Sequence, residues 1–169
     1  MKKLFLTLFI AALALSAGTA QNNRKVIDHA SHGGADVQYR YGFVDDKEQW
    51  IIPPRYDNAE WHADPGIAIV TIYGSPYQRG IIDKYGDFII PITTEYKRIR
   101  WNVDSRRFLL AKKIEGIELW GVADLQGKII IPIKYRTLIW EEDRFKAELP
   151  NGVTVYADRD GNVVGAPTL

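Results

Sequence analysis

Three tryptophans and three aspartates recur with one spacing, and their types suggest binding chemistry more than those of any other residues here. They are Trp61, Trp101 and Trp140, followed three residues later by Asp64, Asp104 and Asp143. Exposed indoles stack on sugar rings, and nearby carboxylates accept hydrogen bonds from hydroxyl groups, so such a row would suit a polysaccharide. The competing interpretation is packing, because tryptophan is usually well buried and aspartate often caps turns. We keep all six as candidate ligand-binding residues.

Catalysis and metal binding find less support in the sequence. Ser75 lies in a turn-like segment that lacks the flanking glycines of a nucleophile elbow. His29 and His32 could bind a metal ion, but zinc needs three or four fixed ligands and these histidines lie in a polar segment near the N-terminus. We therefore expect no enzyme activity, no cofactor and no metal ion.

A second set of aspartates is expected to shape turns. Asp83, Asp124 and Asp158 each precede a glycine by three residues. This spacing is typical of a type I turn, in which the first side chain accepts backbone N–H groups and glycine occupies the fourth position. In the equivalent segment after Asp45, Glu48 replaces the glycine. That exception predicts either a different turn or a non-glycine residue with positive φ.

All of these residues belong to a long repeat. Two kinds of residue recur at the same spacings of 38 and 41 residues: the glycines Gly42, Gly80 and Gly121, and the prolines Pro53, Pro91 and Pro132. Self-similarity at such a period is the signature of a repeat architecture. One β domain is expected over residues 39–169, with repeats at 39–76, 77–117 and 118–152 and a partial copy at 153–169.

Each repeat is predicted to consist of β-strands joined by tight turns. The apolar segments that end in proline are rich in β-branched residues and favour buried strands. Because proline cannot donate to a ladder, it should mark a strand end or a free sheet edge. We expect an all-β fold, a tandem repeat of three- to four-stranded antiparallel units in an open, twisted stacked array. A closed propeller is the alternative, and so few units would have to self-associate to close one.

The segment 1–20 is typical of a cleavable signal peptide. Two lysines precede an apolar run over residues 4–15, and small residues follow up to Ala20. The run is shorter than the roughly 20 residues that a membrane span needs. We expect an exported protein, periplasmic or secreted, without membrane insertion after cleavage. Residues 21–38 are polar and are predicted to be a flexible linker.

Composition limits the partners. The chain has 22 basic and 21 acidic side chains and a formal net charge of +1, and the signal peptide accounts for two of the lysines. Such a balance gives no reason to expect nucleic acid as a partner. The chain has no cysteine, so no disulfide framework supports the fold.

The repeat resembles that of the WG-repeat family. The family's unit looks like Trp-Gly, two apolar residues and Asp, a turn that ends in Gly-Lys, then an apolar-Ile-Pro segment and Tyr. Residues 120–135 match this pattern nearly throughout, whereas Tyr41 and Arg79 stand in place of the tryptophan in the other two copies and the second copy's tyrosine comes late, at Tyr96. The resemblance covers residues 39–164. It implies a non-enzymatic scaffold or binding module and assigns no catalytic residue.

Two functions remain open on this basis. The first is an exported binding or scaffolding module for a protein or peptide, which could add a strand at a free sheet edge. The second is a glycan-binding protein that uses the row of repeat tryptophans. Self-association also remains open.

Overall fold

The structure is a computed structural model that describes residues 25–30, 38–45 and 47–165, with side chains from Arg40 onward. This part of the chain contains fourteen strands and no helix. The strands form four antiparallel sheets. The all-β prediction is therefore confirmed. Within the described ranges, no helix is long and apolar enough to cross a bilayer. The predicted signal peptide, residues 1–20, lies outside the described residues.

The four sheets follow the order of the chain. The first sheet contains β1 (Lys25–Ala30), β2 (Gln38–Val44) and β3 (Trp50–Tyr56). The second contains β4 (Asn58–His62), β5 (Ile67–Ile72), β6 (Gln78–Asp83) and β7 (Phe88–Thr93). The third contains β8 (Tyr96–Asn102), β9 (Arg107–Ile114), β10 (Ile117–Ala123) and β11 (Ile129–Tyr135). The fourth contains β12 (Thr137–Glu141), β13 (Arg144–Glu148) and β14 (Thr154–Ala157).

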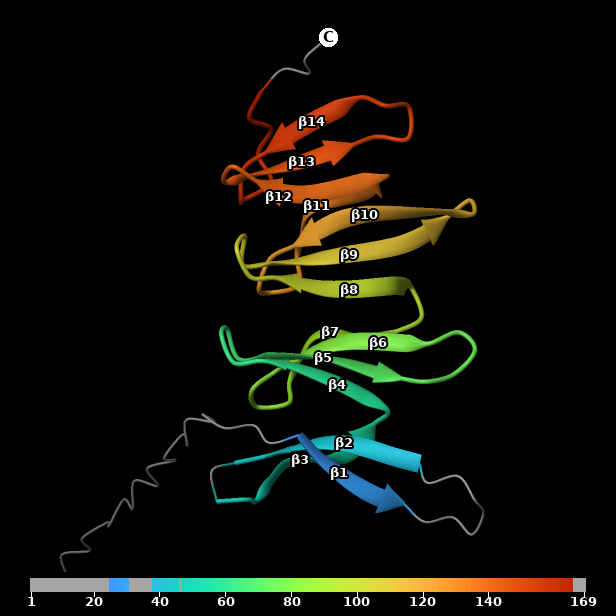
Figure 1. Ribbon diagram of the computed structural model, residues 1–169, viewed down its shortest axis with the longest axis vertical. Helices are drawn as coiled ribbons and strands as arrows, with labels where there is room; N and C mark the ends of the chain where they lie inside the picture. The colour runs from blue at the N-terminus through green and yellow to red at the C-terminus, as the bar shows by residue number, and fades with distance from the viewer. Residues whose placement is uncertain (1–24, 31–37, 46, 166–169) are drawn as a thin grey trace, which may run out of the picture.

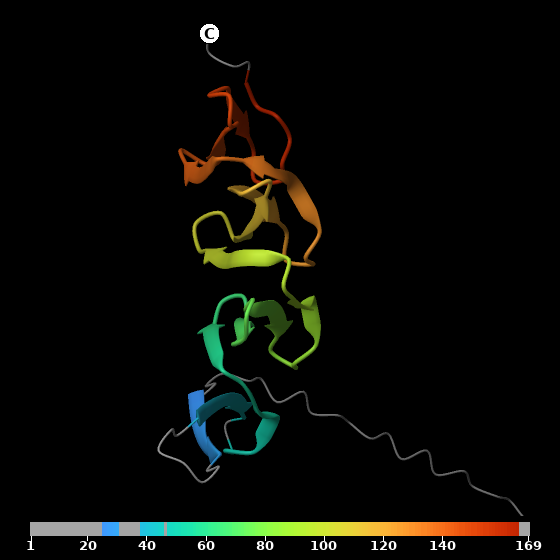
Figure 2. The ribbon, with the colours of Figure 1, turned by 90° about the vertical axis from the view of Figure 1, so that its right-hand side faces the viewer.

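The sheets stack along the long axis of the molecule as an open column. Figure 1 shows the first sheet at one end and the fourth at the other, and Figure 2 shows the same order from the side. The β4–β5, β8–β9 and β12–β13 hairpins lie on one side of the column, the left in Figure 1. The expected stacked array is what forms. The propeller alternative is wrong for this chain, because the sheets follow one line and do not surround an axis.

The sheets are out of phase with the sequence repeats. The second sheet takes β4 and β5 from the first repeat, residues 39–76, and β6 and β7 from the second. The third and fourth sheets are divided in the same way. Each repeat therefore contributes strands to two consecutive sheets, so a single repeat cannot complete a sheet by itself.

The hydrophobic core lies between neighbouring sheets. One buried cluster joins residues of the first and second sheets, a second joins the second and third, and a third joins the third and fourth. Their largest fully buried members include Tyr56, Phe108 and Phe145. Because every cluster draws on two sheets, burial of apolar surface holds the stack together.

The prolines occupy sheet edges, as their missing N–H predicts. Pro53, Pro91 and Pro132 lie in β3, β7 and β11, and each of these strands is at the edge of its sheet. A proline there removes no hydrogen bond from an interior ladder and discourages pairing with another chain.

The aspartate turns form as predicted. In all four copies one carboxylate oxygen of the aspartate accepts the backbone N–H groups two and four residues later, at 2.8–3.0 Å. The exceptional first copy keeps the same turn, with Glu48 N donating to the Asp45 carbonyl at 3.0 Å. Glu48 has φ 60°, the positive value that one of the two predictions required.

The predicted flexible linker over residues 21–38 needs correction for one segment. Lys25–Ala30 forms β1, which pairs antiparallel with β2 from Lys25 opposite Phe43 to Ala30 opposite Gln38. An open strand edge offers backbone donors and acceptors to any extended segment, whatever its side-chain pattern. The polar sequence therefore hid a strand that depends on its neighbour.

Candidate functional site

The three repeat tryptophans lie at equivalent places but pack inward. Each lies in the first strand of its sheet, is half-buried and contacts a buried phenylalanine ring. The ring centroids are 5.8 Å apart for Trp61 and Phe43, 5.2 Å for Trp101 and Phe108, and 4.7 Å for Trp140 and Phe145. At these separations the indoles contribute to three different core clusters, so core packing accounts for one face of each.

The three aspartates that follow the tryptophans have unlike surroundings. Asp64 holds the Arg106 guanidinium through two hydrogen bonds of 2.7 and 3.0 Å, which join the β4–β5 and β8–β9 hairpins. The side-chain hydrogen bond to Asp64 raises the pKa of Arg106 above its usual value. Oδ1 of Asp143 lies 4.0 Å from Nη2 of Arg159. Asp104 is exposed and makes no ion pair within the described ranges. The three carboxylates thus lie apart from one another and do not form a common site.

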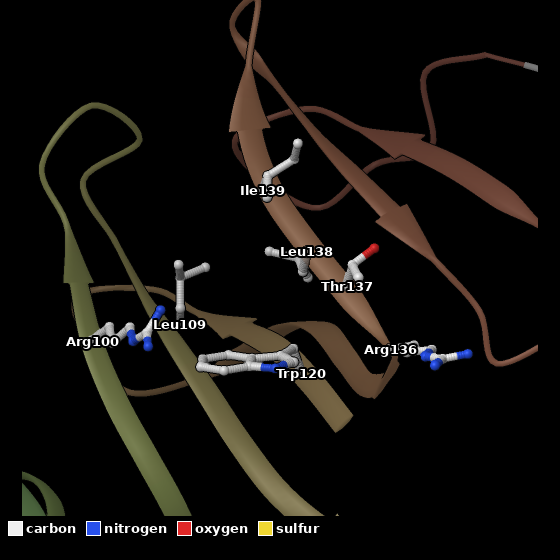
Figure 3. A pocket seen from close by; sticks show the side chains of 7 residues that line it. All are labelled: Arg100, Leu109, Trp120, Arg136, Thr137, Leu138 and Ile139. Atoms are coloured by element: carbon white, nitrogen blue, oxygen red, sulfur yellow. The ribbon is translucent and has the colours of Figure 1, made fainter. Parts of the chain in front are cut away.

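A groove between the third and fourth sheets is the stronger candidate site. It has a volume of about 220 Å³. Figure 3 shows Trp120 forming its floor, Arg100 and Arg136 at its two ends and aliphatic side chains above the indole. Its lining residues are Arg100 from β8, Leu109 from β9, Trp120 from β10, Arg136 from the β11–β12 link, and Thr137, Leu138 and Ile139 from β12.

Local backbone geometry fixes the floor of this groove. The pairing of β10 with β11 shifts register between Trp120 and Val122. Gly121 occupies that irregularity, and a Cβ built on it would lie 2.6 Å from the Ile131 carbonyl oxygen. Only glycine tolerates such a cross-strand approach. The Trp-Gly pair therefore combines a backbone requirement at Gly121 with a half-buried indole that packs against the third core cluster.

The two charged side chains that line the groove, Arg100 and Arg136, are both positive. The guanidinium carbon of Arg100 lies 5.1 Å from the centroid of the Trp120 ring, within the range of a cation–π contact. Arg100 and Arg136 are exposed and form no ion pair within the described ranges. The neighbouring Arg98 does form one, with Glu118 at 3.3 Å. The groove thus offers two guanidinium groups beside an apolar floor, a combination suited to an anion that carries an apolar group.

Within the described column, an indole floor with two flanking arginines occurs at one sheet interface, the one between the third and fourth sheets. Between the second and third sheets, the floor position holds Arg79, and the two arginine positions hold Glu60 and Lys97. Between the first and second sheets, the floor position holds Tyr41, and the position of the second arginine holds Asp57, which is buried. The repeat therefore supplies the shape of this interface, and the third and fourth sheets supply its particular charge.

The sequence interpretation overlooked this site. It treats Trp120 as part of the repeat motif and does not single out Arg100 or Arg136. The available signal is weak: among the full repeats only this copy has tryptophan at the motif position. Nothing in the sequence places Arg100, two strands away in the sheet, beside that indole.

In a second hollow, most of the charged side chains already bind other groups of the protein. It has a volume of about 460 Å³ and is lined on its polar side by Arg107, Asp124, Lys128 and Asp160. Arg107 pairs with Asp160 at 2.8 Å, and Asp124 caps its own turn. Elsewhere in the described part of the chain, no group of three or more histidine, aspartate or glutamate side chains could hold a metal ion.

Comparison with known proteins agrees with the repeat. A family model described as WG containing repeat matches residues 41–74 and 120–138. No curated protein matches the chain. A solved structure described as "Crystal structure of the eukaryotic initiation factor" matches at 13% identity and a TM-score of 0.44, over 77% of this chain and 37% of that one. The chain is thus a module of β repeats, and two of its segments match the WG containing repeat.

Proposed function

We propose that this protein is a non-enzymatic, exported binding or scaffolding module that holds a peptide segment of another protein in the groove beside Trp120. The observation that carries the proposal is the position of this groove along a sheet edge. β12 is the first strand of its sheet and pairs only with β13 in the described chain. A strand edge of this kind can accept an extended peptide through main-chain hydrogen bonds.

The lining of the groove supports this orientation. Thr137, Leu138 and Ile139 are consecutive residues of β12, and all three line the hollow. Because successive side chains of a strand point to opposite faces, three in a row can line one hollow only where it follows the strand's edge. A peptide in the groove would therefore lie beside an unpaired edge.

Size also favours a peptide segment over a small metabolite. Pockets for drug-sized ligands usually enclose about 300–1,000 Å³. The groove, at about 220 Å³, is smaller and suits one or two side chains of a longer ligand. The rest of such a ligand would lie over the neighbouring surface.

Binding of arrayed peptides and arrayed glycans to the purified chain tests this proposal. We expect a family of peptides to bind saturably, with unlabelled peptide competing for the same sites. Saturable binding to glycans, with no peptide retained, would contradict it and favour the tryptophan row. Export is tested separately by expression of the full chain with a C-terminal tag. Intact mass should show cleavage after Ala20, and retention of the whole chain inside the cell would contradict export.

A further inference from the structure

We propose that the groove recognises an acidic peptide strand, in which a carboxylate side chain binds Arg100 at one end of the groove and a bulky apolar side chain two positions away covers the indole of Trp120, while Arg136 at the other end adds to the positive charge. This inference rests on the proposed function and names the chemistry of its ligand. The charges of the groove, its apolar lining and its edge strand carry it.

The charges select an anion. Arg100 and Arg136 flank the floor of the groove (Figure 3), and no acidic residue lines it. Guanidinium groups bind carboxylates with two parallel hydrogen bonds, which fixes the direction of the ligand as well as its charge. A basic peptide would meet two like charges here and is excluded for that reason.

The apolar lining selects a hydrophobic neighbour for the carboxylate. Leu109, Leu138 and the half-exposed Ile139 surround the indole, and 49% of Ile139 is accessible to solvent. Aromatic and arginine side chains in such settings carry much of the binding energy at protein interfaces. Thr137 is the one neutral polar side chain of the lining, and its hydroxyl lies 3.5 Å from Glu148. The unpaired edge of β12 can bond an extended main chain, which a sugar lacks, so the site favours a peptide over an acidic polysaccharide.

Strand geometry links the two requirements. A peptide paired with β12 would be extended, and its residues at alternate positions would point to the same face, roughly 7 Å apart. An acidic residue and an apolar residue separated by one position would then reach Arg100 and the indole together. The sequence pattern expected of the ligand is therefore acidic, any residue, apolar, or the reverse.

An array of heptapeptides tests this pattern on the full chain. Each peptide pairs aspartate or glutamate with leucine, isoleucine, phenylalanine or tryptophan two positions away, and each has a counterpart with asparagine or glutamine in place of the acid. We expect the acidic members to bind and their amide counterparts to bind about tenfold more weakly or worse, as for the loss of one charged hydrogen-bond partner. Affinity should fall as salt is added.

Charge reversal in the protein provides the matched test. Arg100→Glu should weaken binding of the acidic peptides at least about tenfold, and Arg136→Glu should weaken it less, through the loss of positive charge alone. Lys97→Glu makes the same kind of change at the exposed position that corresponds to Arg136 one unit earlier, outside the groove, and should leave binding unchanged. Trp120→Phe should weaken binding while circular dichroism shows an intact fold; Trp120→Ala is unsuitable because the indole packs against the core.

The outcomes separate this inference from the proposed function. Equal binding of acid and amide peptides, or binding that survives both arginine reversals, overturns the inference while peptide binding stands. Absence of binding to every peptide overturns the proposed function as well. Binding of polygalacturonate that both reversals abolish, with no peptide bound, would assign the groove to an acidic polysaccharide and overturn the peptide ligand.

Discussion

Gly127, in the turn between β10 and β11, lies against Ile89 of the preceding sheet so closely that a Cβ on Gly127 would be 2.6 Å from the Ile89 carbonyl oxygen. The same relationship recurs one unit later, where Gly161 approaches the Ile130 carbonyl of β11. Each turn glycine thus lies on the proline-containing strand of the sheet before it. The repeat's glycine serves the contact between units as well as the turn.

Replacement of Gly127 should therefore cost more than replacement of a turn glycine that touches nothing. Gly116 has nearly the same φ, 86° against 80°, and nothing lies within 4 Å of a Cβ built on it. Gly116→Ala should lower the free energy of unfolding by about 1–2 kcal/mol through backbone strain alone. Gly127→Ala should lower it by a further 1–3 kcal/mol or so through overpacking. Urea denaturation measures both losses, and equal losses would show that the stacking contact is unimportant.

The exceptional Glu48 should respond in the opposite direction. It has φ 60°. Its turn belongs to the first sheet, so no described sheet lies before it on which the side chain would clash. Glu48→Gly should relieve about 1–2 kcal/mol of strain and lose about 0.5–1 kcal/mol to the flexibility of glycine, a net small stabilisation. The reciprocal change, Gly86→Glu, should destabilise, because a Cβ there would lie 2.9 Å from the Ile52 side chain. Destabilisation by both changes would contradict this account; thermal unfolding of each variant gives the sign.

The pKa of Asp158 should depend on the hydrogen bonds that its carboxylate accepts in the turn. The side-chain hydrogen bond from Asn162, 2.9 Å long, is the main cause that lowers the pKa of Asp158, and backbone N–H groups of the turn add to it. Asn162→Ala should raise that pKa part of the way toward the ordinary value of about 3.9. Carboxyl-carbon NMR over an acid series measures it. Asn151→Ala, in the neighbouring hairpin, is the control and should leave Asp158 unchanged.

The sign of the linked stability follows from the direction of that shift. Because the folded pKa of Asp158 lies below the unfolded one, its contribution to stability is complete above the unfolded value and is lost as pH falls through the folded value. Asn162→Ala should therefore make the chain less dependent on pH in this acid range and leave its dependence near neutrality unchanged. A change confined to neutral pH would contradict the assignment.

Fluorescence quenching should rank the tryptophans by exposure. In single-tryptophan variants, acrylamide should quench Trp50, which is 45% exposed, more strongly than Trp61, Trp101 or Trp140, which pack on phenylalanine rings. If the three repeat tryptophans were quenched as strongly as Trp50, they would be open on one face and the glycan-binding alternative would regain support.

Local chemistry explains how much of the fold could be predicted. The Asp-x-x-Gly spacing determined the turns because a carboxylate two and four residues from its N–H partners needs no distant residue. The prolines marked sheet edges for an equally local reason, their missing donor. β1 was missed because its strand depends on the open edge of β2.

The candidate site could not be predicted in this way. The sequence singled out Trp61, Trp101 and Trp140 because they recur, and recurrence served the core: each indole packs on a phenylalanine. The groove gathers Arg100, Trp120 and Arg136 from different strands and from the link between two sheets. The residues that distinguish this groove differ from those at the equivalent positions of the other repeats, so a search for recurring residues does not find them.

The sequence by itself determined that this chain forms strands, where its turns occur and that its units repeat, because these depend on residues close together in the chain. The tertiary structure decided which repeat halves share a sheet, which faces of the tryptophans are covered and where the Arg100 guanidinium lies over the Trp120 indole. Those features depend on how one sheet packs on the next, and that packing joins residues up to a full repeat apart.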